Sequence, residues 1–364
     1  MAAFSKLDRA SLYLLGCVIA LATIGLITAV SLAPPGEAWS VLARHCLFLG
    51  LGVGAFLITF SLPTEKMRTW VNPAMAILFV FLCLMLFTGL GRTANSATRW
   101  VAIGPFNLQP SILFQCLWPV AIASWVARDP LRLRDPRELF RIGALFLLVM
   151  LPVLLQPDLG SVVILLIVTG CTFLFSGAPS RILAILLPVL AGLVVLAALV
   201  FPHVASRLTW WQDTPAQVEA GKDALALGGV SGLGPGNGVL KMGWVPEGET
   251  DFILPLVGEE WGLLGTLTIW SLYVAFTFLG MNAARRARSR YGIILMVAAT
   301  LMISFQAAYN MAMVVGLVPV KGLPLPFISR GGSSILALSA LLGIALKAAA
   351  EERRAAPPVT ELFA

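Results

Sequence analysis

A few charged residues interrupt an otherwise apolar sequence where they could move a proton. Asp251 follows a glycine-rich segment and precedes a long apolar run, and Glu259 and Glu260 lie shortly after it. Partial burial at a membrane surface raises the pKa of a carboxyl group, which suits it to act as a general base. Asp251 is therefore the candidate base. The alternative is that Asp251 only caps the helix that follows it, as aspartate does well.

Glu259 and Glu260 would lie roughly 12 Å deeper than Asp251 if the helix were continuous, at about 1.5 Å per residue. Two adjacent acids at that depth in a membrane are costly, which makes them candidates for binding a substrate. The alternative is a helix that begins near Gly258 and leaves both acids at the membrane surface.

Other interruptions combine basic or polar residues with helix starts. Gln109, Asp158 and Ser333 each lie just before or at the start of an apolar run, where the unpaired N–H groups of a helix attract negative charge. If these starts converge with the basic residues Arg99, Lys241, Lys321 and Arg330, they form an anion site suited to a phosphate or pyrophosphate. The simpler alternatives are that Asp158 is only a cap, that Arg99 is an interfacial anchor, and that Lys321 extends to the membrane surface.

Membrane-spanning helices must position these residues. The 364 residues are 59% hydrophobic and only 12% charged, with a mean hydropathy of +0.90, whereas soluble domains carry about 25% charge. This composition excludes a soluble enzyme and a disordered chain. We expect an all-α integral membrane protein that forms one polytopic domain over residues 1–364. Ten spans are predicted, at residues 10–32, 41–60, 71–90, 111–127, 141–155, 161–176, 181–201, 252–281, 292–315 and 333–349.

The distribution of Lys and Arg predicts the orientation of these spans. One set of alternate loops and ends carries 17 of the 25 basic residues, the other set carries 7, and Arg44 falls within a predicted span. By the positive-inside rule, both termini are cytoplasmic, and a long loop over residues 202–251, between spans seven and eight, lies outside. The same rule accounts for the net charge of +7, so nucleic-acid binding is not expected. The five cysteines and two histidines show no metal-ligand spacing.

Four motifs in order along the chain carry a resemblance to a known family. They are Arg99-Trp100 with Gly104 and Gln109-Pro110-Ser111, then Pro157-Asp158-Leu159-Gly160, then Pro246 with Thr250-Asp251-Phe252-Ile253 and Gly258-Glu259-Glu260, and last Lys321-Gly322-Leu323-Pro324-Leu325-Pro326 with Gly331-Gly332-Ser333-Ser334. With these motifs the chain resembles the SEDS family, the FtsW and RodA membrane proteins of bacterial shape, elongation, division and sporulation. The segment from Lys321 to Pro324, and Lys241 before Pro246, look more like the FtsW branch.

The resemblance implies a peptidoglycan glycosyltransferase of the bacterial inner membrane, with its active site facing outside. Such an enzyme polymerises lipid II on the outer leaflet during cell division, among membrane lipids, with a class B penicillin-binding transpeptidase and other divisome proteins. Asp251 matches the essential aspartate of the family and would be the base. Arg99 and Lys321 would neutralise the pyrophosphate. The other residues expected to bind substrate are Gln109, Asp158, Glu259, Glu260 and Ser333. The chemistry also leaves room for a divalent cation, Mg²⁺ or Mn²⁺, shared by the pyrophosphate and a carboxylate.

The chain departs from the family pattern at three positions. Ile112 and Gln115 replace a glutamate and a lysine, and Arg330 replaces an aromatic residue. One hypothesis is that Arg330 supplies the charge that Gln115 lacks; the alternative is that Arg330 faces water or lipid headgroups. The loss of an acid and a base puts unaltered catalysis in doubt. Besides the polymerase, two other functions stay open: a lipid II flippase, and a catalytically weakened scaffold that positions the transpeptidase. The clustering of ionisable residues at the outer face favours the polymerase.

Overall fold

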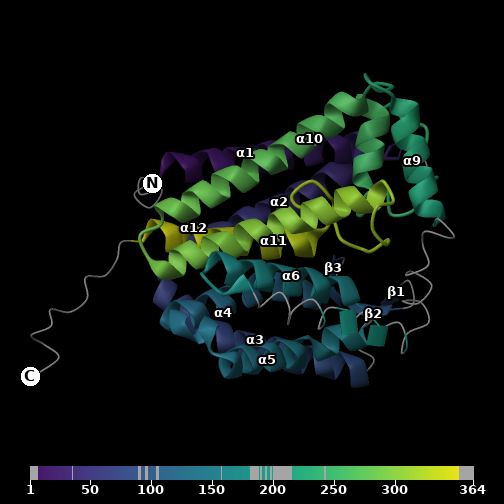
Figure 1. Cartoon of the computed structure of the whole chain (residues 1–364). Coiled ribbons are helices and arrows are strands. Elements are labelled where there is room, and N and C mark those ends of the chain that lie inside the picture. Colours follow the sequence, from purple (N-terminus) through teal and green to yellow (C-terminus); the bar gives the residue numbers. More distant parts are fainter. Residues whose placement is uncertain are drawn as a thin grey trace, which may run out of the picture.

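Long apolar helices, most of them running side by side, make up most of the molecule (Figure 1). The structure is a computed structural model that describes residues 7–34, 36–88, 92–94, 97–103, 106–156, 158–180, 188, 191–192, 195–196, 199, 215–241 and 243–351. Its α-helices are α1 (Arg9–Ser31), α2 (Ala38–Ser61), α3 (Thr64–Thr88), α4 (Phe114–Arg128), α5 (Pro136–Leu155), α6 (Leu159–Phe175), α9 (Ala216–Gly228), α10 (Ile253–Arg286), α11 (Arg290–Val314) and α12 (Gly332–Ala350). Two 3-10 helices, η2 (Pro110–Leu113) and η3 (Pro130–Arg134), precede α4 and α5 respectively.

The helices confirm the prediction of an all-α membrane protein. Within the described residues, eight helices are long and apolar enough to cross a membrane. These correspond to predicted spans one to five and eight to ten, with η2 and α4 forming one span. Predicted span six matches α6, whose apolar stretch Gly160–Phe175 is shorter. Predicted span seven, 181–201, lies outside the described residues except for isolated positions, so the count of ten stays a prediction.

Side chains that cap helix N-termini explain several of the helix starts. Each cap accepts a hydrogen bond from a backbone N–H of the first turn, which would otherwise have no partner. The caps are Asp8 for α1, Asp135 for α5, Asp158 for α6 and Ser289 for α11. Because of the Asp135 cap, α5 begins at Pro136, earlier than the apolar run at 141–155 predicted. Its first turn is charged, and Glu138 pairs with Arg141 at 2.7 Å.

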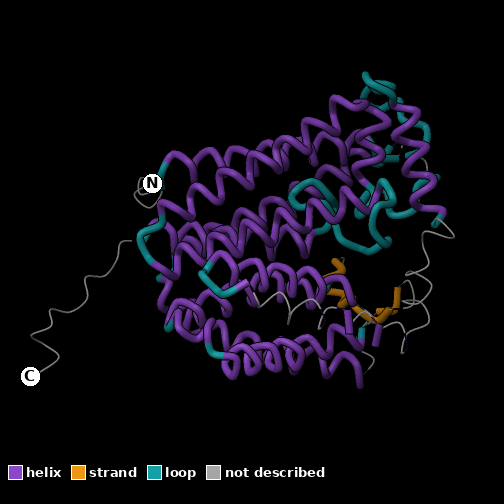
Figure 2. The backbone as a smooth tube through the Cα atoms, viewed as in Figure 1, coloured by secondary structure: helices purple, strands orange, loops and turns teal. Residues whose placement is uncertain are grey.

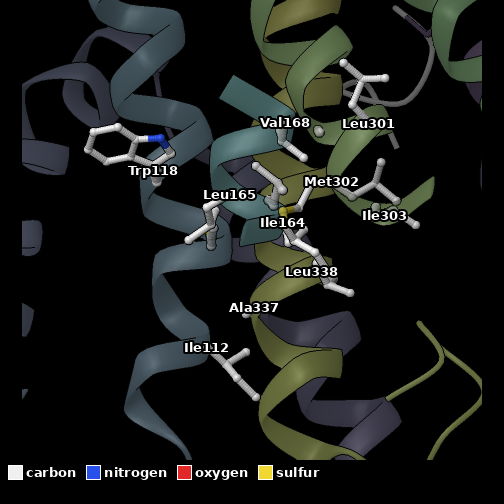
Figure 3. Close-up of a cluster of buried hydrophobic side chains, with 14 of the residues drawn as sticks. Ile112, Trp118, Ile164, Leu165, Val168, Leu301, Met302, Ile303, Ala337 and Leu338 are labelled. Carbon is white, nitrogen blue, oxygen red and sulfur yellow. The ribbon is translucent and has the colours of Figure 1, made fainter. Parts of the chain in front are cut away.

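The core lies where α4, α6, α11 and α12 pack together (Figure 3). Figure 3 shows side chains of Trp118, Ile164, Met302 and Leu338, one from each of these helices, gathered in this cluster. One polar group within it is paired, since the indole Nε1 of Trp118 donates to Thr169 Oγ1 at 2.8 Å. The apolar packing fixes the four helices relative to one another and therefore fixes the starts of η2, α6 and α12.

A small sheet that the sequence analysis did not predict lies in the loop between α3 and η2. Strands β1 (Arg92–Ala94), β2 (Ala97–Ile103) and β3 (Phe106–Leu108) form an antiparallel sheet in the order β1-β2-β3. Strand β2 is rich in residues that favour strands, including Trp100 and Val101. Figure 2 shows the strands at the end of the bundle opposite the start of α1. We call this end, where β3 leads into η2, the site end.

The segment predicted as an outer loop, 202–251, contains α9 and ends at a kinked helix. Residues 202–214 lie outside the described residues. Helix α10 bends at Gly262, whose φ of 68° and ψ of −163° are not helical. A positive φ is open to glycine and strained for other residues, which explains why the bend lies there. Figure 1 shows the first part of α10 beside α9, at a steep angle to the rest. Because the bend follows both acids, the helix is regular from Ile253 through Glu259 and Glu260, and the alternative of a helix that begins near Gly258 is wrong.

Candidate functional site

A buried ion pair joins α6 to the segment between α11 and α12, residues 315–331, here called the Lys321 loop. The Nζ of Lys321 lies 2.7 Å from Oδ1 of Asp158. The two residues are only 6% and 1% exposed. Charges at such burial are tolerated only when they are paired and hydrogen-bonded. Asp158 is thus more than the cap of α6, and Lys321 does not extend to the membrane surface.

Gly160 leaves the space through which Lys321 reaches Asp158. A Cβ atom at position 160 would lie 2.6 Å from Nζ of Lys321 and would also collide with the middle of its side chain. A side chain at this position would therefore displace the lysine. The spacing of Asp158 and Gly160 in one motif has a physical reason: the first residue supplies the negative charge and the second gives access to it.

Three helix starts meet at this ion pair. The backbone N–H of Gln109 donates to Ser333 Oγ at 3.1 Å, and its side-chain Nε2 donates to Asp158 Oδ2 at 3.3 Å. The starts of η2, α6 and α12 are therefore joined, as the anion-site hypothesis requires. The structure brings together the predicted residues Gln109, Asp158, Lys321 and Ser333. We call these four, with Ser111 and Ser161, which bond to Gln109 Nε2 at 3.2 Å and Asp158 Oδ2 at 3.0 Å respectively, the polar cluster.

Asp251 lies beside this cluster, on a turn formed by residues 247–251, here called the Asp251 turn. The N-cap of α10 is Phe252, and no side-chain hydrogen bond caps this helix, so Asp251 is not the plain cap. A Cβ atom at Gly322 would lie 3.1 Å from Oδ2 of Asp251. The candidate base is therefore next to the residue that follows Lys321.

The environment of Asp251 raises the pKa of its carboxyl group to about 7. Burial is the largest cause, and the negative charge of Glu247 adds to it, while the positive charge of Lys321 acts in the opposite direction. Within the described residues, the carboxylate has no hydrogen-bond donor that would hold it ionised. A carboxyl group in this state exchanges a proton near neutral pH, which is what a general base needs.

Hydrogen bonds from the neighbouring helices to carbonyl groups hold the Lys321 loop. Its prolines have no N–H to donate, but their carbonyl groups still accept. Four side chains of α10 and α11 donate to these carbonyls. They are Tyr273 to Pro326, Gln306 to Pro324 at 2.8 Å, Tyr309 to Pro319 at 2.9 Å and Asn310 to Leu323 at 2.7 Å. The sequence analysis missed all four donors. For the three donors on α11, the sequence did carry a signal, which was polar residues at helical spacing within an apolar run.

Glu259 and Glu260 hold a different segment. Oε1 of Glu259 accepts hydrogen bonds from the backbone N–H groups of Val239 and Leu240, at 2.6 and 2.9 Å. Glu260 pairs with Lys241 at 3.0 Å. Both acids therefore fasten the segment after α9 to the first part of α10. Their expected role in binding substrate stays a prediction.

The remaining predicted residues lie at the edges of the site. Arg99 is on strand β2, and its side chain lies outside the described part of the structure. Ile112 and Gln115 are buried at the start of the span that η2 and α4 form. Arg330 forms an ion pair with Glu249 of the Asp251 turn. The described residues show no contact between Gln115 and Arg330, so the compensation hypothesis stays a prediction.

Residues of the Asp251 turn and residues just after α1 line a pocket of about 670 Å³. Its lining includes Leu32, Lys241, Val245, Glu247, Glu249 and Leu256. Among the residues that the structure describes, no group of three or more His, Cys, Asp or Glu side chains could hold a metal ion.

Comparisons with known proteins agree with the resemblance noted from the motifs. A family model described as "Cell cycle protein", for FtsW, RodA and SpoVE, matches residues 8–354. The probable peptidoglycan glycosyltransferase FtsW of Hahella chejuensis (strain KCTC 2396) is 35% identical over 358 residues, which cover 93% of this chain and 89% of that protein.

Two solved structures are also similar. One belongs to a peptidoglycan synthase complex described as coordinating polymerization and crosslinking, with a TM-score of 0.77, 25% identity and coverage of 93% of this chain and 96% of that one. The other is the rod shape determining protein RodA of Thermus thermophilus, with a TM-score of 0.69, 26% identity and coverage of 94% and 96%. The chain described here therefore belongs to the FtsW, RodA and SpoVE family of multi-pass membrane proteins.

Proposed function

We propose that this protein is a peptidoglycan glycosyltransferase that polymerises lipid II during cell division, as the name of its FtsW relatives suggests. One observation carries the proposal beyond the relatives' name. The Asp251 carboxyl, with its pKa raised to about 7, lies against Gly322, next to the buried ammonium group of Lys321. A base and a cation are thereby available side by side, as glycosyl transfer from a lipid pyrophosphate requires.

The reaction assigns each group a role. The acceptor hydroxyl attacks the anomeric carbon of the donor sugar, and the new C–O bond forms as the bond to the pyrophosphate breaks. Asp251 takes the hydroxyl proton, and the lipid pyrophosphate leaves with the electron pair. Lys321 stabilises the developing negative charge, helped by Arg99 from β2. Gln109, Asp158 and Ser333 orient Lys321 and the donor.

A divalent cation, Mg²⁺ or Mn²⁺, is part of the proposal only as an ion shared with the substrate. The described residues offer no protein site with three or more acidic, histidine or cysteine ligands. Asp251 would supply one ligand, and the pyrophosphate would supply others. Bound in this way, the ion would add positive charge at the leaving group.

The proposed setting is the bacterial inner membrane, with both termini cytoplasmic and the site end facing outside. The distribution of Lys and Arg supports this orientation. A class B penicillin-binding transpeptidase is the proposed partner, together with other divisome proteins. Similarity to a complex described as coordinating polymerization and crosslinking supports the pairing.

The position of the polar cluster favours a polymerase over a flippase. A flippase needs a polar path across both leaflets, whereas the cluster is confined to one end and the packing between α4, α6, α11 and α12 beyond it is apolar (Figure 3). Burial of Ile112 and Gln115, where the family has an acid and a base, is the observation that keeps the scaffold alternative open.

The test is a purified complex with the transpeptidase, reconstituted in vesicles with labelled lipid II. We expect glycan chains, separable by length on a gel, and no chains from the Asp251→Asn variant. Movement of lipid II between leaflets without chains would instead establish a flippase. A complex that assembles but does neither would establish a scaffold.

A further inference from the structure

Helix α11 presents a row of polar side chains to the site end. Gln306, Tyr309 and Asn310 share one face, because residues three and four apart are neighbours on a helix. Each donates to a carbonyl group of the Lys321 loop. Asn310 also bonds to the Asp251 turn.

Asn310 bridges the two segments with a single amide group. Its Nδ2 donates one hydrogen bond to the backbone carbonyl of Asp251 at 2.8 Å and another to that of Leu323 at 2.7 Å. The residue is fully buried. An amide nitrogen has two hydrogens, and both are used here. A hydroxyl group has one hydrogen and a carboxyl group has at most one, so a side chain that carries either group could not make both bonds.

The two bridged segments carry the two groups of opposite charge that the proposed reaction needs. Asp251 is itself one end of the bridge, and Leu323 is two residues from Lys321. Between them, Gly322 lies against the Asp251 carboxylate. Arg330 joins the same two segments at Glu249, through an ion pair and a backbone hydrogen bond. The Asn310 bridge is the contact that bonds to Asp251 itself and to the residue two positions after Lys321, so it acts directly on the spacing between base and cation.

We propose that Asn310 is a positioning residue, which sets the spacing between Asp251 and Lys321 by holding the Asp251 turn and the Lys321 loop together. The proposal rests on the proposed function for its catalytic consequence. Asn310 bonds to the backbone carbonyl groups of the two segments and acts through the backbone that it holds. A misplacement of about 1 Å can lower a rate by about 10²-fold, so the loss of this bridge affects turnover more than binding.

The test replaces Asn310 with leucine, whose side chain has the same branched shape and no donor. We expect Asn310→Leu to lower kcat for lipid II about 10²-fold with little change in KM.

Ser304→Ala is the matched control. Ser304 lies on the same helix, and its hydroxyl bonds to Thr277 of α10 at 2.7 Å. The variant therefore also loses a hydrogen bond between helices, but that bond involves neither bridged segment. It should keep wild-type kcat and KM. Wild-type kcat in Asn310→Leu, or an equal loss in Ser304→Ala, would overturn the proposal.

A second measurement does not depend on activity or on the leucine variant folding well. Spin labels at Trp244 and Leu317, both exposed, report the distance between the segment that leads into the Asp251 turn and the Lys321 loop, in a background without the five native cysteines. The distance distribution should broaden in Asn310→Leu and in the milder Asn310→Ser, and stay narrow in Ser304→Ala. An unchanged distribution in both Asn310 variants would refute the bridge. Broadening in a protein whose wild type makes no glycan would refute the proposed function and leave the bridge standing.

Discussion

At the scale of single residues, the ion pair of Asp158 and Lys321 shows how the site keeps charge inside a helix bundle. Each charge is paired and nearly inaccessible to water. Removing one partner of a buried pair leaves an unpaired charge, which costs about 3–5 kcal/mol, whereas replacing both is often nearly neutral. The contribution of the pair to stability can therefore be separated from the contribution of Lys321 to activity.

We expect Lys321→Met to lower the free energy of unfolding by about 3–5 kcal/mol. Adding Asp158→Asn should restore most of the stability without restoring glycan synthesis, because the cation is still missing. Denaturant unfolding in detergent and lipid II turnover, measured on the same preparations, check both statements. If the double variant is active, Lys321 does not stabilise the leaving group.

The raised pKa of Asp251 predicts how activity depends on pH. Below about pH 7 the carboxyl is protonated and cannot accept a proton, so the rate should fall about tenfold per unit on the acid side. Glu247→Gln removes a neighbouring negative charge that raises the pKa of Asp251, so the acid limb should move to lower pH. The pH profile of lipid II turnover measures the shift. A limb that stays in place would mean that Glu247 does not act on Asp251.

At the scale of secondary-structure elements, the place of a residue along its helix determines whether its role in the site could be predicted from the sequence. Gln109, Asp158 and Ser333 are polar residues at starts of apolar runs, so their convergence could be anticipated from helix orientation alone. Asn310 and Gln306 lie inside an apolar run, where side-chain polarity gives no clue to which carbonyl it serves. The sheet and the bend of α10 depend on tertiary contacts, and their only local signals were a short run of strand-favouring residues and a single glycine.

A substitution at Gly262 tests whether the bend of α10 requires glycine. Alanine there would be strained at a φ of 68°, and its Cβ would collide with the backbone of Val230 and Gly232. We expect Gly262→Ala to release the segment after α9, which Glu259 and Glu260 otherwise hold. Faster protease cleavage within residues 229–241, with the transmembrane helices still folded, is the expected result. Unchanged cleavage would show that the bend does not depend on glycine.

The contact between the Asp251 turn and the Lys321 loop at Arg330 allows a second test. Arg330→Tyr restores the aromatic residue of the family but leaves Glu249 without its partner. The pair is partly exposed, so we expect a loss of activity of at most about fivefold, equivalent to the ~1 kcal/mol of such pairs. Exchange of the two charges, Glu249→Arg with Arg330→Glu, should recover it. Recovery of Arg330→Tyr by Ile112→Glu with Gln115→Lys would instead support the compensation hypothesis.

At the scale of the whole molecule, composition and charge distribution determine most of what could be known in advance. The apolar runs predicted the membrane helices, and the order of the four motifs predicted the family, which the comparisons confirm. The sequence could not show that Glu259 and Glu260 serve the segment after α9, because that depends on how α10 bends. It likewise could not show that Lys321 is paired within the bundle.

The central claim is that Asp251 acts as the base of a polymerase and is not needed for folding. Asparagine keeps the size and polarity of the side chain but cannot accept the proton, and positioned bases contribute roughly 10²- to 10⁴-fold to a rate. The most direct measurement is lipid II polymerisation by the purified Asp251→Asn complex beside wild type, with thermal unfolding and partner binding measured in parallel. We expect normal folding and binding with turnover reduced at least about 10²-fold. Glycan synthesis at more than about a tenth of the wild-type rate by a well-folded Asp251→Asn complex would contradict the account.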